Sequence, residues 1–220
     1  MLFRSCCGDL FDVAWPGVDE TALQLYVTTR RGNVFVEDRQ HPHILHTDAT
    51  TAQRRGHVTL AAMVCDDRDV QRHLTQYLLP QTKGRKKFWR QQAEVHADDP
   101  TVIICTESDG WIDQDIMIQL LRRLKTTCSA RAPAKHIVLT MDCHASHLTP
   151  KVLRKAKQLG IMILLIPSKM THELQVLDVA VFRGFKDRLH DAHMATRTRD
   201  ASTTCSLGTW VPPTLQCLRD

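Results

Sequence analysis

A buried strand, a helix and a second strand in direct succession constrain the fold of this chain more than any other feature. Residues 136–141 read HIVLTM, a continuous apolar run that is typical of a strand buried on both faces. Thr149, followed by a proline, matches the start of a helix over residues 151–159, which Gly160 ends. Residues 161–166 then form another apolar run, IMILLI. The pattern predicts a βαβ unit with parallel strands and a right-handed crossover.

Strand patterns earlier in the chain extend this unit into a larger sheet. Residues 17–27 and 34–36 flank a turn at 31–33, which predicts an antiparallel hairpin. Residues 57–65 and 101–105 are rich in β-branched and apolar side chains, so we expect two further strands there. The order of the elements predicts an α/β fold in which helices flank a mixed sheet.

Two further helices and one irregular segment complete the expected order. Apolar residues share one face over residues 113–125 and again over 177–190, as they do in amphipathic helices. Trp111, just before the first of these helices, is expected to be a core residue or a hydrophobic staple. Residues 80–100 contain a basic run without a clear period, and we interpret them as an exposed connector.

Length and composition are those of one globular domain with short additions at its ends. The 220 residues allow a domain over 15–194, preceded by a segment at 1–14 and followed by a tail at 195–220 that is expected to be poorly ordered or an appendage. Hydrophobic residues make up 43% and charged residues 24%, as in folded soluble domains. The net charge of +5 permits a polyanionic partner without requiring one.

Three classes of protein are disfavoured by patterns that the sequence lacks: membrane-spanning proteins, proteins with a signal peptide and zinc-finger proteins. No apolar run approaches the roughly 20 residues of a membrane-spanning helix, and the first residues lack the apolar core of a signal peptide. We therefore expect an intracellular protein. None of the eight cysteines forms a CxxC pair, which argues against a zinc finger.

Three aspartates lie in expected strands or helices or directly beside them. Asp142 directly follows the 136–141 strand, Asp178 lies at the start of the last helix, and Asp19 lies in the first strand. Because converging carboxylates repel one another unless a metal ion neutralises them, such a set suits two Mg²⁺ (or Mn²⁺) ions and phosphodiester chemistry. Spacing alone does not select these three among 24 acidic residues. Asp142 also fits a helix-cap or turn role, and Asp48 is a rival for the first acid.

Short motifs in the C-terminal half carry a resemblance to a known family. They are residues 142–147 (DCHASH, for the family's D-N-x-x-S/A-H), 160–167 (GIMILLIP, for G-I-x-x-x-x-L-P) and 171–179 (THELQVLDV, for T-H-x-x-Q-P-L-D-V). Upstream motifs match more loosely, at residues 19–21 (DET), 58–62 (VTLAA) and 108–111 (SDGW). In this order and spacing, residues 15–190 resemble the DDE superfamily endonuclease domain of pogo, Tigger and jerky-like transposases, a CENP-B-related group.

The resemblance implies both a fold and a function. It implies an RNase H-like fold and a catalytic triad of Asp19, Asp142 and Asp178 that binds two Mg²⁺ or Mn²⁺ ions. It further implies DNA as the partner, metal-dependent cleavage and transfer of DNA strands as the activity, and the nucleus as the location. A homodimer is a further expectation, and no membrane partner is expected. Two alternatives stay open: a domesticated, non-catalytic DNA-binding nuclear protein, and an RNase H-like hydrolase with other substrates.

Two residues and one missing module depart from the family pattern. Cys143 stands where the family has Asn, and Val176 where it has Pro, but neither change removes a carboxylate. Such transposases carry N-terminal helix-turn-helix DNA-binding domains, for which the residues before Asp19 leave no room. We therefore expect a catalytic core that is a fragment, a decayed copy or a domesticated gene, either active or inactive.

Basic residues and histidines supply the remaining candidates. A cationic run with aromatic residues fits contact with DNA, or a nuclear localisation signal, through Lys83, Arg85, Lys86, Lys87, Trp89 and Arg90. His147 and His172 are expected to support loops by hydrogen bonds, with a transition-metal site at Cys143, His144 and His147 as the alternative. Glu20 is expected to be structural, because adjacent strand residues face opposite sides of a sheet.

Overall fold

The described part of the chain alternates strands and helices. The computed structural model describes residues 12–24, 35–36, 43–44, 57–107, 110–145, 147–167, 169–200 and 207–219. The strands are β1 (Val13–Ala14), β2 (Pro16–Gln24), β3 (Phe35–Val36), β4 (His43–Ile44), β5 (His57–Cys65), β6 (Gln76–Pro80), β7 (Val102–Ile104), β8 (His136–Asp142) and β9 (Ile161–Ile166). The helices are α3 (Arg68–Gln71), α4 (Lys86–Val95), α5 (Gln114–Arg131), α6 (Pro150–Gln158), α7 (Thr171–Leu174), the π-helix η2 (Leu177–Val181), α8 (Phe182–Asp200) and α9 (Leu207–Arg219).

A mixed sheet of seven strands organises these described elements. Strand β2 runs antiparallel to β5, β5 antiparallel to β6, and β6 parallel to β7. On the other side of β2, β8 pairs in parallel with β1, β2 and β9. The predicted βαβ unit is confirmed, because β8 and β9 are parallel and α6 connects them. The predicted α/β class with a mixed sheet is confirmed as well.

The predicted N-terminal hairpin is wrong. Strand β2 pairs with β5 along its whole length, from Pro16 opposite Cys65 to Gln24 opposite His57. Strand β3 instead pairs with β4, and the expected turn at 31–33 lies outside the described residues. A long ladder with both faces buried fixes register far more strongly than a short run next to a turn does, because a slip would expose a whole apolar face.

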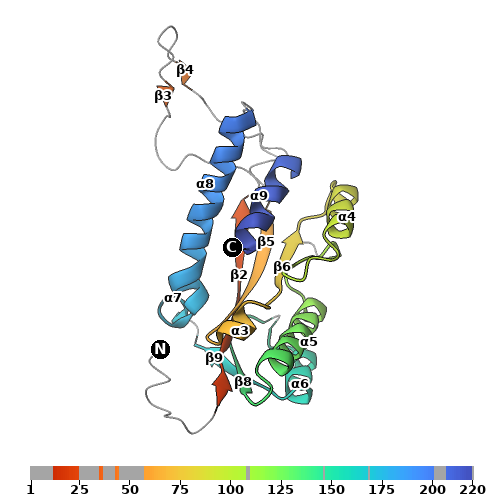
Figure 1. Ribbon diagram of the computed structural model, residues 1–220. Helices are drawn as coiled ribbons and strands as arrows, with labels where there is room; N and C mark the ends of the chain where they lie inside the picture. The colour runs from red at the N-terminus through yellow and green to blue at the C-terminus, as the bar shows by residue number, and fades with distance from the viewer. Residues whose placement is uncertain are drawn as a thin grey trace.

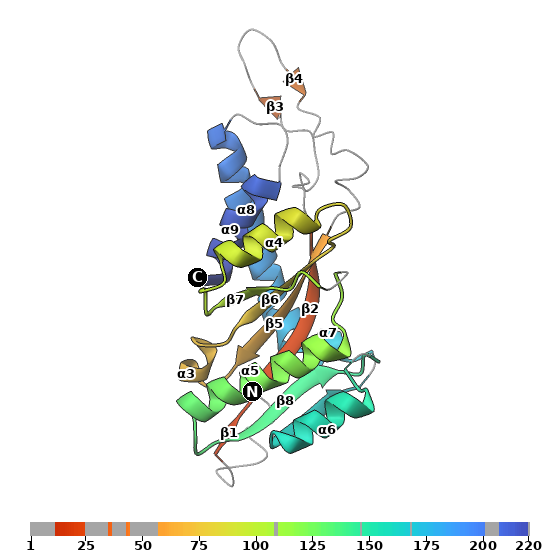
Figure 2. The ribbon, with the colours of Figure 1, turned by 90° about the vertical axis from the view of Figure 1, so that its right-hand side faces the viewer.

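Each face of the sheet carries its own hydrophobic core. On one face, α5 and α6 pack over apolar residues such as Val18, Leu139 and Met141. On the other face, α4, α8 and α9 pack over residues that include Leu23 and Leu60. Figure 1 shows α8 and α9 on one side of the strands and α5 and α6 on the other, and Figure 2 looks onto the side that carries α4, α5 and α6. The sheet is therefore covered on both faces, and its strand ends remain as the place for a polar site.

Side-chain caps mark the starts of α5 and α6, the two helices that cover one face of the sheet. The carboxylate of Asp113 accepts hydrogen bonds from the backbone N–H groups of Asp115 and Ile116, which starts α5 as expected. Thr149 caps α6 by accepting from the N–H of Val152, with the proline at the first helical turn. After α6, Gly160 adopts a left-handed conformation with φ 67°, which lets β9 follow at once.

Two segments that lacked a clear pattern are helical. Residues 80–100 are not an exposed connector, because they contain the end of β6 and helix α4, whose Trp89 is buried. The expectation of a poorly ordered tail fails for Leu207–Arg219, which forms α9. Trp210 of α9 is fully buried, and its indole N–H donates to the carbonyl of Gln24 at 3.0 Å. The tail thus completes the core that α8 begins.

Candidate active site

Two of the predicted acids lie on neighbouring strands. Gly17 of β2 pairs in parallel register with Thr140 of β8. Asp19 and Asp142 each follow two residues later, and because side chains alternate along a strand they leave the same face as those paired residues. Asp19 is buried, with 7% of its surface exposed, whereas Asp142 is half-buried at the end of β8. The parallel pairing therefore brings the two carboxylates to the same edge.

The third predicted acid comes from the element that covers this face. Asp178 lies in the first turn of η2, and η2 contacts β2. Its neighbour Leu177 is buried in the core and anchors the turn, while Asp178 itself is exposed. The fold thus directs acids from β2, β8 and η2 toward one place.

The electrostatics of Asp19 reflect this convergence. The pKa of Asp19 is raised to about 7, chiefly by burial and in addition by the nearby carboxylates of Asp178, Glu20 and Asp142, while a hydrogen bond from the backbone of Glu20 acts in the opposite direction. A carboxyl group in this position holds its proton near neutral pH unless a cation approaches. The acids around Asp19 therefore form a region of excess negative charge that a cation would neutralise.

His147 links two of the acidic side chains. Its Nδ1 lies 2.8 Å from Oδ1 of Asp142, and its Nε2 lies 2.8 Å from Oε1 of Glu20. The imidazole is almost fully buried, with 1% of the side chain exposed. Burial alone would lower the pKa of His147, but the hydrogen bonds and charges of Glu20 and Asp142 raise it. Two carboxylate acceptors need a proton on both ring nitrogens unless one carboxyl group is itself protonated.

Sequence reasoning did not anticipate the role of Glu20 in this link. Glu20 and His147 are 127 residues apart, and no spacing pattern connects them. The adjacent Asp19 points to the opposite face of β2, as alternation requires. The only available signal was that both residues belong to motifs of the same family, D-E-T and D-N-x-x-S/A-H.

The loop after β8 does not assemble the alternative transition-metal site. The thiol of Cys143 lies 3.2 Å from the carbonyl of Ile166, and both nitrogens of His147 face carboxylates. The backbone N–H of His144 donates to Oδ1 of Asp142 at 3.2 Å. These contacts position Asp142 rather than gather the sulfur and imidazole groups around an ion.

The three aspartates match divalent ions in the chemistry of their donors but not in their present arrangement. Within the described ranges, no group of three or more His, Cys, Asp or Glu side chains could hold a metal ion as the side chains stand. The chemistry of the donors nevertheless suits Mg²⁺ or Mn²⁺, which prefer carboxylate oxygens. Asp178 is exposed, so its side chain can turn without disturbing the core. Nearby, the amide of Gln175 is buried and has no hydrogen-bond partner in the described part of the chain. The donor chemistry of the three aspartates therefore fits these ions, whereas the described side chains as they stand do not form a site.

The predicted DNA-contacting run divides into surface cations and a core tryptophan. Lys86 and Arg90 of α4 both pair with the exposed carboxylate of Glu107, at 3.4 and 3.3 Å. Trp89 is 1% exposed and packs edge-to-face against Trp210, with ring centroids 6.4 Å apart. Because a core side chain cannot stack on a base, the prediction that Trp89 contacts DNA is wrong. The remaining cations, Lys83, Arg85 and Lys87, lie partly or fully exposed around the start of α4.

Several other predicted positions lie outside what can be described or differ from expectation. Asp48 and the side chain of His172 lie outside the described residues. Trp111 is not in the core: 67% of its surface is exposed, and its ring meets His57 edge-on, with centroids 5.8 Å apart. Trp111 follows Gly110, whose φ of 83° turns the chain outward before α5 begins.

Comparison with known sequences identifies relatives of the described domain. The sequence profile of the DDE superfamily endonuclease family matches residues 57–206. A human protein described as "Pogo transposable element with ZNF domain" is 28% identical over 121 residues, which cover 54% of this chain. The same alignment spans 8% of the human protein. The resemblance drawn from the motifs is thereby confirmed.

Solved structures with the same architecture are complexes of the Mos1 transposase. The Mos1 mariner paired-end complex with Mn matches with a TM-score of 0.53 at 11% identity, covering 99% of this chain and 56% of the Mos1 chain. A pre-cleavage Mos1 transpososome matches with a TM-score of 0.53 at 11% identity, covering 99% and 58%. At this identity the likeness establishes the fold, and the predicted RNase H-like fold is confirmed. Among the described helices, none is long and apolar enough to span a bilayer.

Proposed function

Because this chain belongs to the DDE superfamily endonuclease family, we propose that it forms the core of a metal-dependent DNA strand-cleaving and strand-transfer domain. Asp19, Asp142 and Asp178 are the proposed catalytic and metal-binding residues, with two Mg²⁺ or Mn²⁺ ions. The observation that carries the proposal is the convergence of acids from β2, β8 and η2, in which Asp19 is buried beside like charges. Such a cluster is stable when cations neutralise it.

Each acid has a distinct part in this proposal. When bound, the ions would activate a water or a DNA 3′-hydroxyl and stabilise the leaving oxygen. Asp19 supplies a carboxylate on the rigid centre of the sheet, whose pKa of about 7 makes its charge dependent on a nearby cation. Among the described residues, the backbone N–H of His144 and the ring of His147 both contact Oδ1 of Asp142, which holds this carboxylate at the end of β8. Asp178 supplies an exposed carboxylate from the first turn of η2, the element that contacts β2.

His147 is proposed to support the loop that carries Asp142. Its two hydrogen bonds, each 2.8 Å long, tie Asp142 to Glu20 and therefore tie the end of β8 to β2. Groups that hydrogen-bond a metal-ligating carboxylate fix its orientation and tune its affinity for the ion. His172 remains a proposed loop support on the strength of its motif alone.

The proposed partner is DNA, and the proposed location is the nucleus. The human relative is described as a pogo transposable element, and the Mos1 structures are described as paired-end complexes and a transpososome. Because this chain spans 8% of the human relative and just over half of the Mos1 chains, transposition and a homodimeric assembly are proposals here. Lys83, Arg85, Lys86, Lys87 and Arg90 are proposed to contact DNA phosphates, whose negative charge attracts such cations.

The test is nicking of supercoiled DNA by the purified chain with Mn²⁺ or Mg²⁺, compared with the Asp142→Asn variant. The proposal expects nicking by the unaltered chain that disappears both in the variant and in EDTA. Equal nicking by the two proteins would contradict it.

The alternative function is a domesticated, non-catalytic DNA-binding nuclear protein. It draws support from the absence, in the described residues, of a side-chain group that could hold a metal ion as it stands. Cys143, which replaces the family's Asn beside Asp142, points the same way. DNA binding that is unaffected by metal and by Asp142→Asn, with no nicking, would favour this alternative.

A further inference from the structure

A groove runs between α5 and α6 on the face of the sheet opposite α8. It has a volume of about 420 Å³, and both helices line it. Four of its lining residues are cations, Arg122 from α5 and Lys151, Arg154 and Lys155 from α6. Asp115 is the one acidic residue among them. The lining therefore carries four positive charges against one negative charge, a net charge of +3.

Little of this positive charge is neutralised within the described part of the chain. Lys151 pairs with Asp115 at 2.6 Å, although both side chains remain more than half exposed. The ammonium group of Lys155 lies 3.5 Å from the amide oxygen of Gln158, which is uncharged. Arg122 and Arg154 are exposed. Exposed ion pairs contribute little and exchange readily with other anions, so the groove can accept an anionic ligand.

The groove starts at the edge of the sheet that carries the candidate active site. Helix α6 begins a few residues after Asp142, and Lys151 lies in its first turn. The 2.6 Å pair with Asp115 brings the first turn of α5 to the same end. From there the groove continues along both helices past Arg122, Arg154 and Lys155. Because the side chain of Asp142 leaves the sheet on the face opposite α5 and α6, a strand with its scissile phosphate there would reach this groove by passing over the end of β8.

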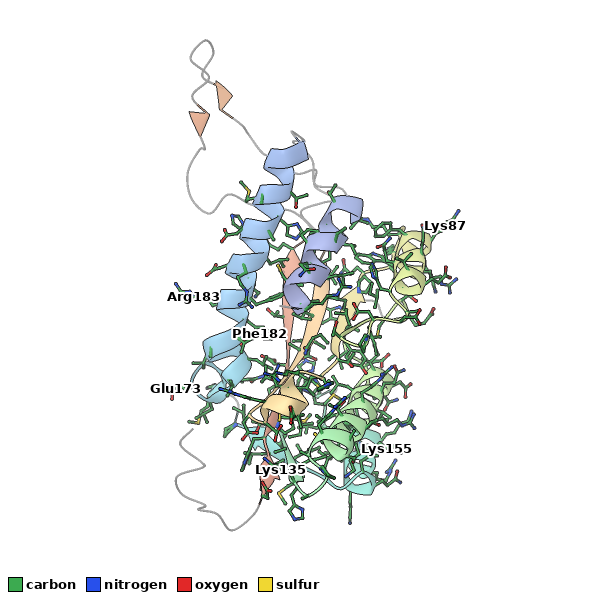
Figure 3. The ribbon with its side chains drawn as sticks, viewed as in Figure 1. Lys87, Lys135, Lys155, Glu173, Phe182 and Arg183 are labelled. Carbon is green, nitrogen blue, oxygen red and sulfur yellow. The ribbon has the colours of Figure 1, made fainter. Side chains whose placement is uncertain are left out.

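A second group of exposed cations, near the start of α4, can be located relative to the groove in the figures. Lys155 and Lys87 both project from the right-hand side of the molecule in Figure 3, whereas Arg183 projects from the opposite side. Figure 2 views this right-hand side and shows α4, α5 and α6 facing the reader together. Lys87 of α4 and Lys155 of the groove thus project from the same side of the molecule in this view, although α4 packs on the sheet face opposite α5 and α6.

We infer that the α5–α6 groove binds the phosphate backbone of the DNA that flanks the scissile position. The inference rests on the proposed function, because it takes DNA as the substrate, and it adds a surface that the family motifs do not include. Four cations in a groove suit successive phosphates of one strand, and the absence of exposed aromatic side chains from the lining suits binding without regard to sequence.

The test compares three paired variants by fluorescence anisotropy with a labelled random-sequence DNA duplex over a range of salt concentrations. Arg122→Gln with Arg154→Gln removes one cation from each wall of the groove. Arg131→Gln with Lys157→Gln removes one exposed cation from each of the same helices outside the groove. Lys83→Gln with Lys87→Gln removes one cation just before α4 and one cation from its first turn. Thermal unfolding of each variant checks that its fold is intact.

The groove pair should reduce the slope of log Kobs against log salt by about 1.8, from about 0.9 for each lost phosphate contact, while the control pair leaves the slope unchanged. Equal slopes for the groove pair and the unaltered chain would overturn the inference, as would a loss confined to the α4 pair. Mn²⁺-dependent nicking at saturating DNA is measured in parallel. If nicking persists while the groove pair leaves the slope unchanged, the inference fails and the proposed function stands.

Discussion

The imidazole Nε2 of His147 lies 2.8 Å from the carboxylate of Glu20, a residue 127 positions earlier in the chain. Through its other nitrogen, His147 holds Asp142 at the same distance. A buried histidine between two acids thus joins the end of β8 to β2, beside the place where Asp19 and Asp178 approach.

His147→Gln should weaken binding of Mn²⁺ by about 10- to 100-fold, because a metal-ligating carboxylate loses the group that orients it. Glu20→Gln keeps an acceptor oxygen for Nε2 and should retain most of the affinity, whereas Glu20→Ala should lose affinity as His147→Gln does. Isothermal titration calorimetry measures all three. A purely structural His147 would lower the thermal stability of the variant and leave its Mn²⁺ affinity intact.

Asp19 should make the protein less stable as the pH rises. Its folded-state pKa of about 7 lies above the ordinary value of 3.8, so the folded state holds a proton that the unfolded state releases. The contribution of Asp19 to stability is therefore present below about pH 4 and is lost as the pH rises through 7. Asp19→Asn stays neutral and should exceed the parent by roughly 1–4 kcal/mol at pH 8, an upper range set by the shift.

Urea unfolding of the parent and Asp19→Asn at a series of pH values tests this. The difference in free energy of unfolding should grow between about pH 4 and pH 7 and shrink when Mg²⁺ is added to the parent. A difference that stays constant across this window would show that Asp19 is not held protonated by its surroundings.

His193 should have the opposite dependence on pH. Its ring stacks on Trp210 with centroids 5.7 Å apart, and its Nε2 lies 3.2 Å from the hydroxyl of Thr214. The pKa of His193 is lowered to about 4, chiefly by burial and in addition by the charge of His190. Because the unfolded state gains a proton first, this contribution is complete above about pH 6.5 and is lost as the pH falls toward 4.

His193→Gln retains a polar group near Thr214 and does not titrate in this range. The stability of the parent relative to this variant should therefore fall by roughly 1–3 kcal/mol between pH 7 and pH 4. Denaturant unfolding monitored by tryptophan fluorescence gives the values. If the free energies of unfolding of the two proteins changed in parallel with pH, His193 would be exposed to solvent rather than buried between α8 and α9.

Trp89 should be a core residue and not a base-stacking residue. Its indole N–H is buried without a hydrogen-bond partner in the described part of the chain, so Trp89→Phe removes an unsatisfied donor and should cost little stability. Trp89→Ala should cost about 3–5 kcal/mol, as large cavities in a core do. Thermal unfolding and DNA anisotropy are measured together. Loss of DNA affinity in a stably folded Trp89→Phe protein would restore a role in DNA contact.

The regular elements were predictable because their local signals agreed with the packing. The run at His136–Asp142 is buried on both faces, and Thr149 and Gly160 mark the limits of α6. Such caps and apolar runs act locally, so they can be read without knowing the rest of the fold. The three acids could be named only through family motifs, since spacing does not show which side chains converge.

The elements that the sequence predicted wrongly depend on contacts between distant segments. The partner of β2 is β5, and the sequence alone offered the closer β3. Helix α4 begins within a basic run, and α9 contains Pro212 and Pro213, which argue against a helix. Both segments are nevertheless amphipathic, and the basic run and the prolines obscured that pattern. The contact between Trp89 and Trp210 across the core stabilises both helices.

Titration of Mn²⁺ into the protein, followed by electron paramagnetic resonance, tests most directly whether Asp19, Asp142 and Asp178 form one metal site. The unaltered chain should bind Mn²⁺, and Asp19→Asn, Asp142→Asn and Asp178→Asn should each lose most of that affinity. Asp191→Asn, which removes an exposed acid from α8, should bind as the parent does. Failure of the unaltered chain to bind Mn²⁺, or equal binding by the three triad variants, would contradict a shared metal site.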